Sequence, residues 1–220
     1  MDGTIKGGRA MNHFSLEYIE HLKEILNKFP HEQFENLVGV MLDAYREGRR
    51  IFVMGNGGSA STASHWVCDI NKGCCLGKDT KFKMISLNDS ISTLLAYAND
   101  ISYEDVFVEQ LKNFFNPGDV VIGISGSGNS ANILKAIAYA NRHGGITVGL
   151  CGCSGGKLYH MVDIPIHAKA DDMQKVEDIH LIIAHMAMQG IIRKLDGERY
   201  CGIEHFKPSG DELQTESHNL

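Results

Sequence analysis

The chain has 220 residues, of which 43% are hydrophobic, and its formal net charge is -6. This length suits a single domain, and the hydrophobic content supports a sizeable core and excludes an intrinsically disordered chain. An acidic chain is a poor candidate for nucleic-acid binding, and it must attract an anionic ligand with local dipoles or a metal ion rather than with its overall field.

The sequence carries no signal for export or membrane insertion. It has no apolar run of 18 residues, and its first stretch, MDGTIKGGRAMNHF, lacks the apolar core of a signal peptide. We therefore expect a cytoplasmic protein with no membrane or nucleic-acid partner, whose six cysteines stay reduced. Residues 1–11 are predicted to form a flexible leader and residues 197–220 a polar C-terminal tail.

Two helices are predicted before the first strand. Apolar residues recur at helical spacing over residues 14–29, where Pro30 ends the pattern, and again over residues 32–47. We expect these helices to pair as a hairpin that packs against the main domain or against another subunit.

Short apolar runs alternate with helical patterns through the rest of the chain. The predicted strands are residues 50–54, 82–87, 119–124, 146–151 and 162–166, and the predicted helices are residues 60–72, 90–98, 103–114, 130–143, 155–160 and 173–195. This alternation is typical of an α/β fold with a parallel sheet covered on both faces, so residues 12–196 are predicted to form one domain. Five strands favour the flavodoxin-like order 2-1-3-4-5, which opens a crevice at the carboxyl ends of strands 1 and 3.

Glycine- and serine-rich turns follow those same two strands. Residues 51–61 read IFVMGNGGSAS and residues 123–132 read GISGSGNSAN. Glycine lets a ligand approach the backbone closely, a helix N-terminus offers unpaired N–H groups, and Ser125, Ser127 and Ser130 add hydroxyl donors. We predict that the two turns form a phosphate site; the alternative is that these residues only build turns and helix caps.

Neither turn has the spacing of a nucleotide-binding motif. The stretch GNGGSA does not fit G-x-G-x-x-G, and the chain has no G-x-x-x-x-G-K-[ST]. The pair of turns therefore favours a small phosphorylated molecule over a nucleotide.

Two histidines and two carboxylates are placed at helical spacing. His65 and Asp69 are four residues apart and share a helix face, where they could bind a divalent metal ion or simply hydrogen-bond to each other. Glu177 and His185 lie eight residues apart in the last predicted helix, a rise of about 12 Å. One ion between these two would need both side chains extended, or one of them supplied by a neighbouring chain.

Together these motifs resemble the sugar isomerase (SIS) domain family, and within it the phosphoheptose isomerases. The resemblance rests on GNGGSASTASH, LNDS, GISGSGNSANILKAI and VEDIHLIIAH and extends over about residues 12–195. It implies a flavodoxin-like three-layer domain and a homotetramer with active sites at subunit interfaces. It also implies a zinc-dependent aldose–ketose isomerisation that converts sedoheptulose 7-phosphate into D-glycero-D-manno-heptose 7-phosphate.

Carried over motif by motif, the resemblance implies two sets of site residues. The substrate contacts fall on Asn56, Gly57, Gly58, Ser59, Asn88, Asp89, Ser125, Gly126, Ser127, Asn129 and Ser130. The metal positions fall on His65, Asp69, Glu177 and His185, and the last three of these are also the catalytic candidates.

Two of the metal positions depart from the family pattern, which has Glu in place of Asp69 and Gln in place of Glu177. In the family that Glu serves as base and the last His as acid. Aspartate is one methylene shorter than glutamate, and a displacement of about 1 Å can cost about 100-fold in rate. Our hypothesis is that the carboxylates exchange roles, so that Asp69 mainly holds the metal ion and Glu177 shares or takes the role of base.

The residues leave two functions open: a sugar-phosphate isomerase, or a non-catalytic SIS-domain protein that senses sugar phosphates or binds a partner. A scaffold has no need for two imidazoles and two carboxylates beside a phosphate site, which favours the enzyme. His180 is expected to pack or to support the site, and Trp66 to form part of its wall.

Overall fold

The structure is a computed structural model that describes residues 8–197. Of the two predicted end segments, residues 1–7 and 198–220 lie outside the described part, and helix α1 (Gly8–Leu26) begins within the stretch expected as a leader. None of the described helices is both long enough and apolar enough to cross a membrane.

One parallel sheet forms the centre of the domain. Its strands are β1 (Arg50–Gly55), β2 (Lys83–Ser86), β3 (Val120–Ser125), β4 (Ile146–Cys151) and β5 (Ile164–His167). They lie in the order β2-β1-β3-β4-β5, which confirms the predicted order. At the carboxyl ends of β1 and β3, Gly55 is paired with Ile124, so the crevice between these strands opens where the two predicted turns begin.

The predicted helices are present, with two local differences. They are α2 (His31–Glu47), α3 (Gly58–Cys68), α4 (Ile91–Asp100), α5 (Val106–Phe114), α6 (Ala131–Arg142), α7 (Gly156–Met161) and α8 (Met173–Asp196). The segment predicted as residues 60–72 is α3 followed by the π-helical turn η1 (Asp69–Gly73), and the segment 103–114 begins with the 3-10 turn η2 (Tyr103–Asp105). A π turn within a helical segment is frequent at functional sites.

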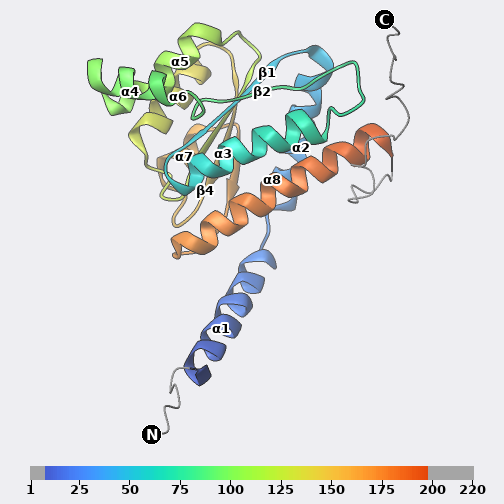
Figure 1. The fold of residues 1–220 in the computed structure, drawn as a ribbon, viewed down its shortest axis with the longest axis vertical. Coiled ribbons are helices and arrows are strands. Elements are labelled where there is room, and N and C mark those ends of the chain that lie inside the picture. The colour runs from blue at the N-terminus through green and yellow to red at the C-terminus, as the bar shows by residue number, and fades with distance from the viewer. Residues whose placement is uncertain (1–7, 198–220) are drawn as a thin grey trace, which may run out of the picture.

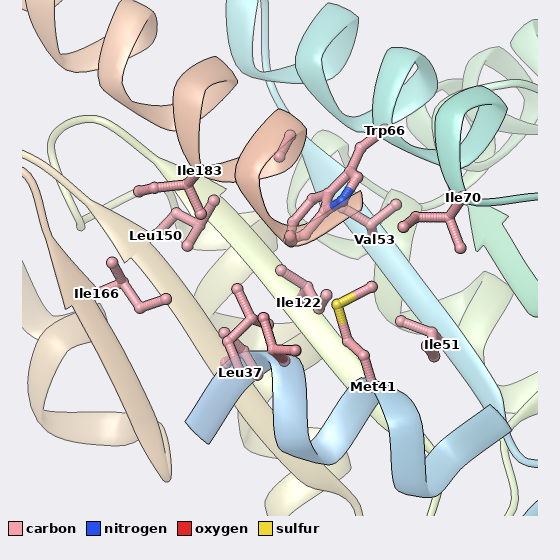
Figure 2. Close-up of a cluster of buried hydrophobic side chains, with 14 of the residues drawn as sticks. Leu37, Met41, Ile51, Val53, Trp66, Ile70, Ile122, Leu150, Ile166 and Ile183 are labelled. Atoms are coloured by element: carbon pink, nitrogen blue, oxygen red, sulfur yellow. The ribbon is translucent and has the colours of Figure 1, made fainter. Parts of the chain in front are cut away.

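Helices cover both faces of the sheet (Figure 1). Strand residues alternate between the two cores, because Ile51 and Val53 face α2, α3 and α8, whereas Phe52 and Met54 face α5, α6 and α7. Figure 2 shows the first core, where side chains of α2, α3 and α8 meet those of the strands. Trp66 of α3 is fully buried in that core, so it belongs to the interior of the domain rather than to the wall of a site.

The two N-terminal helices are disposed differently from the expected hairpin. Helix α2 packs on the sheet, whereas α1 projects away from the domain (Figure 1). A hydrogen bond of 2.5 Å from the Tyr18 hydroxyl to Asp178 Oδ2 ties α1 to α8, and this bond raises the pKa of Tyr18 to about 12. Farther from the domain, Phe14 and Ile19 are 65% and 48% exposed, so α1 carries apolar surface that this chain does not cover.

His180 is a fully buried titratable residue of α8. Neither ring nitrogen has a well-placed hydrogen-bond partner in the described part of the chain. Burial lowers the pKa of His180 to about 4, an effect that the nearby backbone of Cys151 offsets in part. The ring is therefore neutral in the folded protein at pH 7, in keeping with the packing role that the sequence suggested.

This burial predicts acid-sensitive stability. Below pH 6.5 the unfolded chain protonates His180 while the folded chain does not until about pH 4, so the free energy of unfolding should fall by roughly 3 kcal/mol across that window. We expect His180→Leu to remove this part of the acid loss, measured as the difference between variant and parent in urea unfolding at pH 7 and pH 4.5. The exposed His160→Gln is the control. Equal acid loss in parent and His180→Leu would contradict the prediction.

Candidate active site

The two turns meet at the carboxyl ends of β1 and β3. In the first turn Gly57 has φ +55° and immediately precedes α3. In the second turn Gly128 has φ +65°, and a Cβ there would lie 1.9 Å from the carbonyl oxygen of Gly155. The second turn thus needs glycine both for its backbone conformation and for its close contact with the loop before α7.

A pocket of about 140 Å³ lies between the turns and the start of α8. It is lined by Asn56, Ser59, Ile124, Ser125, Gly126, Ser127, Ser130, Met173 and Glu177. All of these except Ile124 and Met173 are among the residues singled out in the sequence. The pocket therefore joins the serine turn to a carboxylate that comes from a helix nearly 50 residues farther along the chain.

The serine turn leaves hydroxyl groups facing the pocket. Ser125 Oγ and Ser130 Oγ are 3.0 Å apart, and Ser127 Oγ accepts a hydrogen bond from the backbone N–H of Asn129. Ser130 is the residue that precedes α6, yet its side chain makes no capping hydrogen bond. The alternative that these serines only cap the helix is therefore not supported at Ser130.

Three of the residues expected at the substrate also form hydrogen bonds within the protein. The side-chain amide of Asn88 donates to the carbonyl of Gly55 and accepts from its N–H, at 2.8 and 3.1 Å, and so ties the segment after β2 to the end of β1. Asp89 accepts a hydrogen bond from Ser64 Oγ at 2.6 Å. The Asn129 amide bonds to the carbonyl of Ser127 and to the N–H of Lys157, so it shapes the second turn.

His65, Asp69 and His185 come together because α3 and α8 pack against each other. The two histidine Nε2 atoms are 3.0 Å apart, and Asp69 Oδ2 lies 3.2 Å from His65 Nε2 and 3.7 Å from His185 Nε2. These three side chains could hold a metal ion, since their donor atoms all lie within 4.8 Å of one another. Two imidazole nitrogens and one carboxylate oxygen suit zinc or another divalent ion.

Glu177 is not part of this group, although the resemblance places it among the metal positions. Its carboxylate lies over Gly58, where a Cβ would be 2.5 Å from both carboxylate oxygens. Gly58 is the first residue of α3, and the partial positive charge at a helix N-terminus favours a negative group there. The structure thus separates the four residues into a group of three and a carboxylate in the pocket.

Met173 and Ile124 line the pocket but were not expected there. Met173 is the first residue of α8, and its sulfur lies over Gly126, where a Cβ would be only 2.4 Å from it. The sequence pattern places Met173 in the helix predicted over residues 173–195 and indicates no role in the site. No local pattern links it to the second turn, because that contact arises from the packing of α8 across the sheet.

Comparison with known proteins assigns the fold to a family. Residues 17–152 match the family model described as the SIS domain. The chain is 38% identical over 170 residues to the phosphoheptose isomerase of Geotalea daltonii, covering 74% of this chain and 84% of that one. It is 35% identical to the phosphoheptose isomerase of Helicobacter pylori, covering 81% of this chain and 92% of that one.

A solved structure agrees with these relatives. Phosphoheptose isomerase GmhA from Neisseria gonorrhoeae superposes with a TM-score of 0.74 at 27% identity, covering 83% of this chain and 96% of that one. The sheet order, the two turns and the sequence relatives all lead to the same assignment: this chain belongs to the SIS domain family, in its phosphoheptose isomerase branch.

Proposed function

We propose that this chain is a cytoplasmic sugar-phosphate aldose–ketose isomerase that converts sedoheptulose 7-phosphate into D-glycero-D-manno-heptose 7-phosphate. The relatives named phosphoheptose isomerase support the substrate. The observation that carries the proposal is the pocket that joins the serine turn to the Glu177 carboxylate. A phosphate site and a base in one pocket are what such a reaction requires.

The serine turn would bind the phosphate of the sugar. Ser125, Ser127 and Ser130 surround the pocket with hydroxyl groups, and α6 starts at the next residue with its N-terminus toward the turn. Hydroxyl donors and a helix N-terminus stabilise an anion without a basic side chain, which fits a chain with net charge -6.

Glu177 would move the proton. Isomerisation transfers one proton between C1 and C2 of the sugar and one between the two oxygens, through an enediol. Glu177 is only partly buried and lines the pocket, whereas Asp69 lies beside His65 and His185. These positions support the exchanged roles, with Glu177 as base and Asp69 at the metal site, and leave His185 as the candidate acid.

Zinc is the proposed ion for His65, Asp69 and His185. Their donor set and spacing fit a divalent ion, and a bound divalent ion would polarise the sugar carbonyl.

We also propose that the protein is a homotetramer with α1 at an interface. The exposed apolar residues of α1, Phe14, Leu16 and Ile19, support this, since symmetric association would cover them.

The phosphate assignment predicts a selective loss of affinity. Ser127→Ala or Ser130→Ala should weaken binding of sedoheptulose 7-phosphate roughly 10-fold, because each removes a hydroxyl donor to a charged group. Binding of unphosphorylated sedoheptulose should change little, as measured by isothermal titration calorimetry. The exposed Thr80→Ala serves as the control. Equal losses for the two sugars would place the phosphate elsewhere.

The carboxylate assignment predicts two different defects. Glu177→Gln should keep zinc bound and lower turnover by 100-fold or more, because it removes the base and preserves the shape. Asp69→Asn should lose zinc first and recover activity in part when zinc is added in excess. Metal analysis beside turnover of the ketose phosphate tests both.

Two outcomes would decide against this assignment. Full activity in Glu177→Gln, with inactive but zinc-loaded Asp69→Asn, would make Asp69 the base. Unchanged metal content and turnover in both variants would favour a non-catalytic sugar-phosphate-binding protein.

The interface proposal predicts that the assembly depends on α1. Phe14→Glu combined with Ile19→Glu should dissociate the tetramer into smaller species, because charges at a buried apolar contact are costly. Sedimentation velocity at micromolar concentration measures this, with the exposed Glu24→Gln on the same helix as the control. A parent protein that sediments as a monomer, or a double variant that stays tetrameric, would contradict the proposal.

A further inference from the structure

Two asparagine side chains join the two turns across the crevice. Asn56, in the first turn, donates from Nδ2 to Asn132 Oδ1, and Asn132 Nδ2 donates back to Asn56 Oδ1, both at 2.9 Å. Asn132 lies in the first turn of α6 and is only 2% exposed. Asn56 itself lines the pocket, so the pair connects a buried amide to an amide that a ligand can reach.

The backbone fixes which way this pair is oriented. The N–H of Ile133 donates to Asn132 Oδ1 at 2.9 Å, and a backbone N–H can bond only to the oxygen of an amide, not to its nitrogen. Asn132 must therefore donate to Asn56 from Nδ2, and Asn56 must accept this bond with Oδ1. The orientation of the Asn56 amide is thus set by the hydrogen bond between Ile133 and Asn132, in which Asn56 takes no part.

A third group occupies the remaining lone pair of that oxygen. The hydroxyl of Tyr103 donates to Asn56 Oδ1 at 2.8 Å, so this oxygen accepts two hydrogen bonds and has no capacity left. One N–H of Asn56 Nδ2 is used by Asn132. In the described part of the chain, its second N–H bonds to no protein acceptor.

The segment that carries Tyr103 is held by the same helix that carries Asn132. Lys135, one turn along α6, bonds to both carboxylate oxygens of Asp105 at 3.1 Å and lies 3.2 Å from Glu104 Oε2. Ser102 caps this turn by accepting from the N–H of Glu104. Helix α6 thus positions both partners of Asn56.

We propose that Asn132 and Tyr103 are positioning residues that act through Asn56, locking its amide so that it offers the ligand a single N–H donor. The group that meets Asn56 must then be an acceptor: a hydroxyl oxygen, carbonyl oxygen or developing oxyanion of the sugar. This inference rests on the proposed function for the identity of the ligand, but not for the orientation of the amide.

Asn132→Asp gives the sharpest test, because it keeps size and shape. It retains an oxygen for Ile133 and Asn56 but replaces the Nδ2 donor with an oxygen that faces Asn56 Oδ1. We expect the Asn56 amide plane to rotate in a crystal structure and kcat for sedoheptulose 7-phosphate to fall roughly 10-fold to 100-fold. The new carboxylate lies in the first turn of α6 and should also weaken binding of inorganic phosphate, so a variant that adds no charge is needed beside it.

Tyr103→Phe is a milder variant that keeps the ring on the exposed turn η2. Loss of one hydrogen bond to Asn56 should lower kcat about 3-fold to 10-fold with no change in thermal unfolding. The matched control is Tyr97→Phe, which removes a hydroxyl that bonds to Asn113, away from the pocket, and should leave kcat unchanged.

A double-mutant cycle distinguishes positioning from general damage. In an Asn56→Ala background, Asn132→Asp and Tyr103→Phe should each reduce kcat no further, since both act through the group that is gone. Full additivity, or an unrotated Asn56 amide in Asn132→Asp, would overturn the proposal. If the parent protein turns over no ketose phosphate, the proposed function fails, and the crystal structure of Asn132→Asp still decides the positioning role.

Discussion

The parallel pairing of β1 with β3 is the constraint on which the rest of the site depends. It joins two strands that are not consecutive in the chain and sets Gly55 beside Ile124, so the turns that leave them start side by side. The helices that follow these two strands, α3 and α6, lie on opposite faces of the sheet. The crevice is thus a consequence of topology, and the reciprocal bond between Asn56 and Asn132 spans it.

Helix α8 supplies the second half of the site from outside the sheet. It packs along α3, so residues two turns apart on α8 meet different parts of this segment. Glu177 lies over Gly58 at the start of α3, and His185 lies beside His65 toward its end and beside Asp69 at the start of η1. The eight-residue spacing of Glu177 and His185 is long for two ligands of one ion, but it lets each side chain contact a different part of the neighbouring helical segment.

Most of the fold can be predicted from the periodicity of apolar residues and from the residues that form turns. The strands and the two turns follow from local apolar runs and from glycine and serine placement, because these features act over a few residues. The sheet order is expected from the number of strands and their alternation with helices. The pairing of His65 with Asp69 likewise follows from a four-residue spacing within one helix. Each of these contacts depends on neighbours in sequence.

What the sequence leaves out depends on how separate elements pack. The projection of α1, the cover that Met173 forms over Gly126 and the separation of Glu177 from the histidines are set by helix placement over distances that no local pattern encodes. Asn88 shows the same limit: no local pattern predicts that its amide bonds to both the N–H and the carbonyl of Gly55 at the end of β1.

The placement of the two carboxylates gives the departures from the family pattern a physical reading. Asp69 has a short side chain whose oxygen already lies 3.2 Å from His65, on the same face and one turn away, so it has little reach left for a ligand in the pocket. Glu177 is longer by one methylene, belongs to no hydrogen-bonded pair in the described part of the chain, and lies where the helix dipole of α3 favours its charge. A glutamine there would keep the shape but could not accept a proton, so under the proposed roles a shorter acid at position 69 and an acid at position 177 would compensate each other.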